Sequence, residues 1–479
     1  AKASNNTLSE FCVETLVAMK PTRPEVIRAI PAFWALKVLR GVCLHRGVGQ
    51  HYDLAKVTAE LDEFWSHSWQ TRASLKYACV LYLNNSLPAF CLGIIFSLAA
   101  AGFYIARILP AAAGREHFEC LWCTPAGVIG CCAGLLVWKR RKLVFLDVAC
   151  IDQRNPVRKA EGLISMGAFL RSSKRMLVLW DMSFTSRLWC VFELAAYLHS
   201  HRGKKADLVV CPVSVGSVLL VGHFGLTMFY LLFILLPAAV SFYPYGALLM
   251  ASLCFPSFTA LAYVVLGHCR SIETIHHEVR NFTIEHSSSG CCAKGHIDRR
   301  TNEPIQCDRD IISRCIIAWF GSLQSFEHHV RGQVREVLIH QLTHNTFTYW
   351  RMVQLTSPAL FVGLDRLASA VVRDARFPME LVLLITKDWL ILLPTLLLVL
   401  LQLTYKLRGR CGTKLKQLLA SLLCVLVGVV IFAAVIVGEG VCLYLIEDEA
   451  LARLVILALH LPVALFLWWR IPRAEHTLA

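Results

Sequence analysis

Eight long, largely uncharged windows constrain the fold of this chain more than any other feature. A helix of about 20 apolar residues crosses the roughly 30 Å of hydrocarbon in a bilayer. The windows that reach or approach this length are 87–105, 120–138, 217–241, 242–267, 355–372, 389–405, 417–438 and 454–469. The 479 residues are 56% hydrophobic, with a mean hydropathy of +0.55, which is too apolar for a string of soluble domains. The sequence therefore predicts a polytopic α-helical membrane protein with about eight spans.

The distribution of charge predicts the orientation of these spans. Basic residues fill 139–142 after the second window and 406–416 before the seventh, whereas acidic residues cluster at 439–449. Basic loops stay in the cytosol, so we expect both basic stretches and both chain termini on the cytosolic side. The fifth window, 355–372, is kept as a span although Asp365 and Arg366 interrupt it, because an even number of spans must separate the two basic stretches.

The net charge of +15 indicates that the basic residues bind an anionic partner. Most Lys and Arg residues flank the apolar windows, and no aromatic-basic motif for nucleic acid is present. We therefore expect the lipid bilayer and its anionic headgroups as partners, and no nucleic acid. The 20 cysteines lie largely in spans or in segments expected in the cytosol, where reduced thiols are the rule.

Three short apolar runs, 143–147, 176–180 and 207–213, are typical of strands buried on both faces. Asn155 and Pro156 predict the start of a helix between the first two runs, and Thr185 or Ser186 can cap a helix between the second and third. The order β-α-β-α-β predicts a small cytosolic α/β module with a parallel sheet. Any active site then lies at the carboxyl ends of the strands.

A further strand and helix, 61–69 and 74–84, precede the first two apolar windows. If those windows form a hairpin, both ends return to the same membrane face, and 62–68 can rejoin the sheet beside 143–147. This arrangement predicts Phe64 and Phe145 on adjacent strands. Gly130 and Gly134 provide a GxxxG surface for close contact of the two helices in the hairpin.

These features divide the chain into eight segments. They are an N-terminal cytosolic region (1–60), the first part of the module (61–86), a transmembrane hairpin (87–138), the second part of the module (139–215), a second hairpin (217–267), a cytosolic Cys/His-containing region with helices at 308–319 and 326–342 (268–350), a transmembrane region of about four spans (355–469) and a cytosolic tail (470–479).

Asp62-Glu-Phe-Trp-Ser66 and Val144-Phe-Leu-Asp147 resemble, in this order, the first-strand box and the second strand of Toll/interleukin-1 receptor (TIR) domains, which have a flavodoxin-like fold. Ser172-Ser-Lys-Arg-Met-Leu-Val-Leu-Trp180 resembles the third strand. Ser186-Arg-Leu-Trp-Cys-Val-Phe-Glu-Leu194 is similar to the plant-type signature in which Ser-x-Trp-Cys leads to Glu-Leu. Cys150-Ile-Asp-Gln153 resembles fungal heterokaryon-incompatibility domains, and the whole chain resembles multi-pass dinoflagellate proteins with a Phe-Trp-Ser-His-Ser-Trp box.

The resemblance implies a candidate activity. In catalytic TIR domains, the Glu of this helix is required to cleave the nicotinamide–ribose bond of NAD⁺, and it corresponds to Glu193. NAD⁺ would be a substrate, with no resident cofactor. Ser66, Asp147 and Asp181 lie near predicted strand ends and are candidate substrate-binding residues. Trp189 and Tyr197, one turn on either side of Glu193, are candidate pocket residues.

The alternative is that Glu193 bonds a backbone amide or Arg187 and that the module only binds partners. The leading functional hypothesis is then a membrane-anchored TIR-like signalling or scaffold protein that associates with other TIR-like modules. An NAD⁺ glycohydrolase is the second hypothesis. A channel or transporter ranks third, because Asp365 is the one acidic or basic candidate near the centre of a predicted span.

A second candidate site lies in the polar region between the fourth and fifth windows. Cys291, Cys292, His296 and Cys307 are residue types that bind zinc tetrahedrally, although their spacing fits no standard zinc ribbon or finger. The alternative is a set of reduced thiols with a loop histidine, and the sequence leaves both open.

Overall fold

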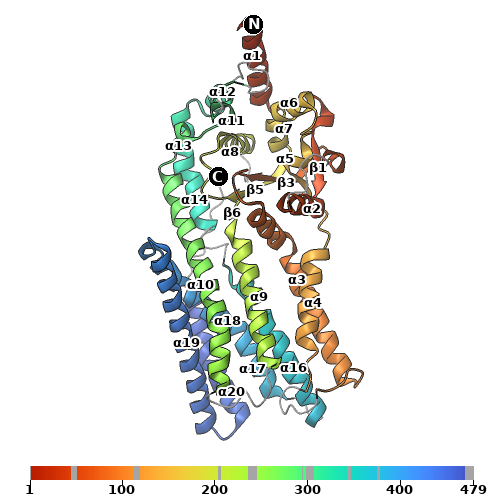
Figure 1. The fold of residues 1–479 in the computed structure, drawn as a ribbon, viewed down its shortest axis with the longest axis vertical. Coiled ribbons are helices and arrows are strands. Elements are labelled where there is room, and N and C mark those ends of the chain that lie inside the picture. The colour runs from red at the N-terminus through yellow and green to blue at the C-terminus, as the bar shows by residue number, and fades with distance from the viewer. Residues whose placement is uncertain are drawn as a thin grey trace.

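A six-stranded mixed sheet lies at one end of the molecule, and long apolar helices extend away from it to the other end (Figure 1). The computed structural model describes residues 2–44, 51–112, 119–202, 207–235, 245–293, 295–297, 307–341, 347–374 and 378–469. The predicted cytosolic tail, 470–479, lies outside the described residues.

The sheet has the strand order β2-β1-β4-β3-β5-β6. Its strands are β1 Arg28–Pro31, β2 Lys56–Val57, β3 Leu61–His67, β4 Leu143–Phe145, β5 Ser173–Trp180 and β6 Asp207–Pro212. The pairs β3–β4, β3–β5 and β5–β6 are parallel, as the sequence predicts for this part of the module. The pairs β1–β2 and β1–β4 are antiparallel, so the sheet as a whole is mixed.

The strand β1 and the edge strand β2 come from the N-terminal region, which was predicted to be a separate segment. Ile30 pairs with Val144 and Pro31 with Leu143, so this region completes the sheet next to β4. Ile30 is fully buried. The prediction missed these strands because β1 is four residues long and β2 is two, too short for a hydrophobic period to be recognised.

The sheet is assembled across the first predicted hairpin. Phe64 on β3 is paired in register with Phe145 on β4, and their rings stack with centroids 4.4 Å apart. Phe169, which belongs to the helix Met166–Arg171, packs against Phe145 with ring centroids 4.6 Å apart. The prediction that Phe64 and Phe145 lie on adjacent strands is confirmed.

The helices near the sheet are mostly short. They are α1 Lys2–Ala18, α2 Ala32–Cys43, α5 Asp147–Cys150, α6 Pro156–Ile164, α7 Met166–Arg171, α8 Leu188–Ser200, α11 Gly290–Ala293, α12 Asp308–Phe320, α13 Leu323–His329 and α14 Arg335–His340. Asn155 caps α6 by accepting hydrogen bonds from the amides of Val157 and Arg158, as predicted. The predicted cap of α8 is wrong, because α8 begins two residues after Ser186, with Arg187 at the N-cap position.

The longer or more apolar helices form the rest of the molecule. They are α3 Ala73–Ile105, α4 Cys123–Val137, α9 Ser214–Leu235, α10 Tyr245–Arg280, α15 Tyr349–Leu355, α16 Ser357–Asp374, α17 Met379–Thr386, α18 Leu393–Leu407, α19 Lys414–Leu445 and α20 Glu449–Trp469. The π-helical turn η8, Lys387–Leu392, joins α17 to α18, and η6, Val330–Val334, joins α13 to α14. The 3₁₀ turns are η1 Pro24–Val26, η3 Tyr52–Leu54, η5 Ile284–His286 and η9 Arg408–Arg410.

Among the residues that the structure describes, five helices are long and apolar enough to cross a membrane, compared with the eight spans predicted. They are α3, α9, the continuous run Met379–Arg410, α19 and α20. A sixth requires α15 and α16 to count as one span, although they are bent by 52° where the sequence predicts its weakest window. The window 120–138 forms a helix of only 15 residues, α4. The windows 217–241 and 242–267 meet in 236–244, outside the described residues.

Charged groups lie towards the ends of these long helices. Near one end of α19, Gln417 accepts a hydrogen bond from Arg270; near the other, Glu439 pairs with buried Lys387 of η8. Gln417 and Glu439 are roughly 33 Å apart along the helix at 1.5 Å per residue, which matches the hydrocarbon thickness of a bilayer. The seventh apolar window ends at 438, just before Glu439, but α19 continues to Leu445.

Glycine allows α3 and α4 to touch along their backbones. A Cβ on Gly134 would lie 2.3 Å from Cα of Ala89, and one on Gly130 would lie 2.4 Å from the carbonyl oxygen of Leu92. Asn85 of α3 also donates a hydrogen bond to the carbonyl of Leu135 at 2.8 Å. The predicted GxxxG contact is confirmed, and it holds together the hairpin that separates β3 from β4.

We expect Gly134→Ala to destabilise the protein by about 1–3 kcal/mol, because the added methyl group meets backbone atoms that cannot move aside. Gly102→Ala is the matched control in α3, since nothing lies within 4 Å of its Cβ position. That control should be neutral or stabilising by up to about 1 kcal/mol, because Ala favours helix. Thermal unfolding of the full chain in detergent measures both, and equal melting temperatures for the two variants would contradict this packing.

Candidate functional site

The carboxyl ends of three parallel strands bring together three of the residues proposed from the sequence. Ser66 is the penultimate residue of β3, Asp147 lies two residues beyond β4, and Asp181 directly follows β5. Numbered along the chain, the four parallel strands have the order 2-1-3-4 across the sheet. In doubly wound sheets a ligand binds between the first and third strands, where the winding reverses. Ser66 and Asp181 flank this position, between β3 and β5.

Glu193 reaches the same place from α8. The Ser66 hydroxyl donates a hydrogen bond to Glu193 Oε2 at 2.5 Å. The partner of Glu193 is thus this hydroxyl, rather than Arg187 or a backbone amide. One turn earlier on α8, the Cys190 thiol donates to the carbonyl of His67 at 3.6 Å. These two contacts join α8 to the end of β3.

The carboxyl group of Glu193 titrates far from its ordinary range. Its residue is partly exposed, but protein atoms surround the carboxyl group, and this desolvation raises the pKa of Glu193 to about 8. The hydrogen bond from Ser66 opposes the rise, and the charge of Asp147 adds to it. Near neutral pH the group is therefore mostly protonated and can exchange a proton with a ligand, a property common in functional sites.

Asp147 is held on the β4 side of Glu193. Its carboxylate accepts hydrogen bonds from the amide of Val148 at 2.8 Å and from Nε1 of Trp69 at 2.9 Å. His67 Nε2 lies 3.9 Å from Asp147 Oδ1, and burial lowers the pKa of His67. The contacts fix Asp147 on the rim of the site.

Asp181 is held on the β5 side. It accepts hydrogen bonds from the hydroxyls of Thr71 at 2.6 Å and Ser183 at 2.8 Å. The Ser183 hydroxyl also bonds Ser68 Oγ at 2.7 Å. Lys76, which is 4% exposed, donates to the carbonyl of Ser68 at 3.0 Å and supplies a buried positive charge beneath the acidic groups.

The site contains residues that sequence reasoning did not propose. His67 and Ser68 belong to the same box as Ser66 and could have been found from it, and Lys76 is in the first turn of α3. Glu278 of α10 lies near Thr185, with the oxygens 3.5 Å apart, and burial raises its pKa to about 7. No sequence signal places Glu278 here, because α10 approaches α8 only through tertiary packing.

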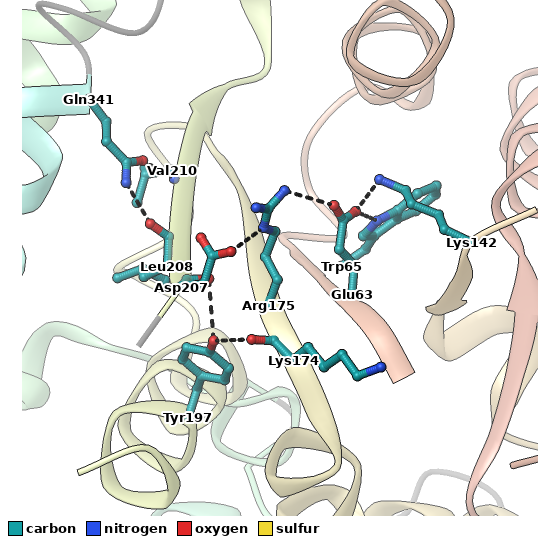
Figure 2. A network of polar contacts seen from close by, with 10 residues as sticks. All are labelled: Glu63, Trp65, Lys142, Lys174, Arg175, Tyr197, Asp207, Leu208, Val210 and Gln341. Carbon is teal, nitrogen blue, oxygen red and sulfur yellow. Dashed lines mark hydrogen bonds and ion pairs between the residues drawn. The ribbon is translucent and has the colours of Figure 1, made fainter. Parts of the chain in front are cut away.

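The polar atoms of Tyr197 and Trp189, the two predicted pocket residues, bond partners away from Glu193. Tyr197 lies at the opposite, amino edge of the sheet, where its hydroxyl donates to the carbonyls of Lys174 and Asp207 (Figure 2). The indole of Trp189 donates to Asp308 Oδ2 of α12 at 3.3 Å. Helical spacing placed both beside Glu193, but the neighbouring elements draw their polar atoms elsewhere.

The amino edge carries a separate network of paired charges (Figure 2). Glu63 accepts from Lys142 at 2.6 Å and from the indole of Trp65 at 2.8 Å, and its other oxygen lies 3.7 Å from Arg175. Arg175 in turn pairs with Asp207 at 2.6 Å. Each charge has an opposite partner, so this network is structural, whereas Glu193 has a hydroxyl as its hydrogen-bond partner among the described residues.

The four candidate zinc ligands, Cys291, Cys292, His296 and Cys307, lie together in the structure. One ligand atom from each lies within 4.8 Å of the others. A second group, which was not predicted from the sequence, consists of Cys120 and Cys123 at the start of α4 and Asp365 of α16.

Two surface pockets lie away from Glu193. One is lined by η1, the end of α5 and α6, and the other lies among α3, α4 and α9.

Compared with family models, curated proteins and solved structures, the chain matches none of them. The TIR resemblance stays a prediction that rests on the quoted residues.

The raised pKa of Glu193 predicts a pH dependence of stability. Its pKa is about 8 in the folded protein and about 4.5 as a free side chain, so the folded state binds the proton more tightly. Its contribution to stability is therefore full below pH 4.5, falls as the pH rises to about 8, and is lost above it.

We expect Glu193→Gln to lose less stability than the unmodified chain between pH 6 and pH 9, because Gln has no proton to release. Melting temperatures of the full chain in detergent at the two pH values measure this. Glu14→Gln, on the exposed face of α1, is the matched control and should behave like the unmodified chain. The same loss in all three proteins would contradict the buried carboxyl group.

Proposed function

We propose that the protein is a multi-pass membrane protein whose α/β module is a TIR-like signalling module on the cytosolic face, acting by association with other such modules. One observation carries the proposal: the strand with the Asp62–Ser66 box pairs with the strand at Val144–Phe145 across a membrane hairpin. The resulting order of the parallel strands, 2-1-3-4, is the beginning of the flavodoxin-like order 2-1-3-4-5.

The connections between sheet and membrane support a signalling role. Helix α3 begins six residues after β3 ends and runs without a break for 33 residues into the apolar region. Helix α9 begins two residues after the end of β6. The thiols of Cys79 and Cys211, 3.5 Å apart, join α3 to β6 directly. With such short connections, a rearrangement of the apolar helices must move the strands that carry the site, since packed rigid elements transmit displacement.

Association is tested with the full chain, fluorescently labelled at one position, in native membranes. Single-molecule photobleaching should give two or more bleaching steps per spot at expression levels where a monomeric membrane protein gives one. Glu193→Gln should leave the number of steps unchanged, because it keeps the shape of α8. One step at every density would contradict association.

A second candidate function, cleavage of the nicotinamide–ribose bond of NAD⁺, is favoured by the contact between Ser66 and Glu193. A carboxylate at this position can accept hydrogen bonds from ribose hydroxyls and stabilise the positive charge that develops on the ribose as nicotinamide leaves. Water then completes the hydrolysis. The hydroxyl of Ser66 orients the carboxyl group for this role.

For this second candidate, Glu193→Ala should reduce nicotinamide release from NAD⁺ by at least about a hundredfold, the usual cost of removing such a stabilising group. If the ionised carboxyl group is the active form, kcat/KM should rise as the pH passes through about 8. Glu14→Gln is again the control. Equal background rates for the unmodified chain and Glu193→Ala would leave association as the function.

The third hypothesis, a channel or transporter, gains no specific observation from the described residues. Lys387, a buried cation among the apolar helices, is paired with Glu439 and with Asp388. His460 Nε2 lies 3.9 Å from the same Glu439 carboxylate. Charges that neutralise one another in this way join helices rather than line an open path.

A further inference from the structure

The region between α10 and α12 gathers four metal-binding side chains. Cys291 and Cys292 belong to α11, His296 follows it, and Cys307 directly precedes α12. Their ligand atoms all lie within 4.8 Å of one another. Three thiols and one imidazole are a recognised ligand set for structural zinc.

The distances fit a metal better than a disulfide. A tetrahedral zinc ion with Zn–S bonds of about 2.3 Å places its sulfurs about 3.8 Å apart. Cys292 Sγ and Cys307 Sγ are 4.0 Å apart. A disulfide would instead bring two sulfurs to about 2.05 Å.

The backbone after α11 turns back so that the imidazole returns to the two thiols. The amide of Gly295 donates to the carbonyl of Cys292 at 3.1 Å, and the amide of His296 donates to the carbonyl of Cys291 at 3.0 Å. Gly295 and His296 both have positive φ angles, 65° and 59°. This conformation costs little at glycine but is unfavourable at His, so His296 is held against its backbone preference.

A buried ring nitrogen of His296 supplies independent support. Its Nδ1 atom is inaccessible to solvent and has no hydrogen-bond partner within the described part of the chain. A buried polar atom without a partner costs about 1–3 kcal/mol. A metal ion bound by the cluster through Nδ1 would remove that cost.

Hydrogen-bond donors already point at the sulfurs. The Ser289 hydroxyl donates to Cys292 Sγ at 3.3 Å and lies 2.7 Å from Cys291 Sγ. The amide of Asp308 donates to Cys291 Sγ at 3.4 Å. Outer donors of this kind stabilise thiolate ligands and orient them.

The second group of metal-binding residue types has a different explanation. The carboxylate of Asp365 accepts hydrogen bonds from the amides of Cys123 and Thr124 and from the Thr124 hydroxyl, at 2.6–3.0 Å. Asp365 thus satisfies the free amides at the start of α4. No orphaned ring nitrogen or second carboxylate accompanies that group in the described residues.

We propose that Cys291, Cys292, His296 and Cys307 bind one Zn²⁺ ion as a structural site. The site joins α11 to the start of α12 and thereby braces α8. Asp308, next to Cys307, accepts the hydrogen bond from Trp189 of α8. Before α11, Ser288 forms a β-bridge with Arg187, and its carbonyl accepts from the amide of Leu188 at 3.0 Å. The proposal is independent of the function proposed for Glu193.

The test measures zinc in the full chain purified in detergent with zinc in the buffers and without a chelator. Elemental analysis should give one zinc per chain. Cys307→Ser should contain close to none, and His296→Gln should bind zinc at least about tenfold more weakly. Cys43→Ser, at the end of α2, is the matched control and should keep one zinc per chain. Replacing zinc by Co²⁺ should give the visible absorption of a tetrahedral thiolate site, and Cys307→Ser should lose it.

A second measurement needs no variant. Chelation of the unmodified chain should increase the alkylation rates of Cys292 and Cys307 at least about tenfold and leave that of Cys43 unchanged. The proposal is overturned if the unmodified chain holds no zinc, or if Cys307→Ser keeps it. A disulfide between Cys292 and Cys307 in chain purified without reductant would also overturn it.

Discussion

The fold depends on the pairing of two strands that a pair of apolar helices separates in the sequence. β3 and β4 are adjacent only if α3 and α4 run side by side and return the chain to the same face. Three features enforce this return: the glycine contacts of Gly130 and Gly134, the hydrogen bond from Asn85 to Leu135, and the stacked rings of Phe64 and Phe145. The packing of α3 against α4 and the pairing of β3 with β4 therefore form one cooperative unit.

The two edges of the sheet use charge in opposite ways. At the amino edge, Glu63 is 6% exposed but meets Lys142 and Arg175, so its burial is compensated. At the carboxyl edge, Glu193 meets a hydroxyl and the repulsive charge of Asp147, so its burial is not compensated and its pKa rises. If position 193 served stability alone, an apolar residue there would stabilise the folded protein more than an uncompensated carboxyl group does. The uncompensated carboxyl group is the strongest physical sign of function in this molecule.

The apolar helices and the polar region after α10 both converge on α8. Glu278 at the end of α10 lies beside Thr185, just before α8. Ser288, just before α11, and Asp308, the first residue of α12, form hydrogen bonds with α8. Glu193 is thus positioned from three directions: the sheet, a long helix that leads into the apolar layer, and the cysteine–histidine cluster.

Sequence alone determined the features that depend on local pattern. The apolar windows became helices, the runs at 143–147, 176–180 and 207–213 became parallel strands, and Asn155 capped its helix, because each follows from hydrophobic period or local hydrogen bonding. Even the Phe64–Phe145 pairing was predictable, since a hairpin returns both ends to one side. The nearness of Ser66 to Glu193 could be predicted, because strand ends and a lone carboxyl group are visible in the sequence.

Tertiary structure decided what local pattern cannot encode. The strands β1 and β2 are too short to predict, and in the described residues five or six helices are long and apolar enough to span a membrane, compared with eight predicted windows. The polar atoms of Tyr197 and Trp189 bond partners away from Glu193, and Glu278 lies beside Thr185, because the direction of a side chain depends on which distant element offers its polar atom a partner. The same holds for the meeting of Cys291, Cys292, His296 and Cys307, which requires a reversal of the backbone at Gly295 and His296 and the return of the chain to α12.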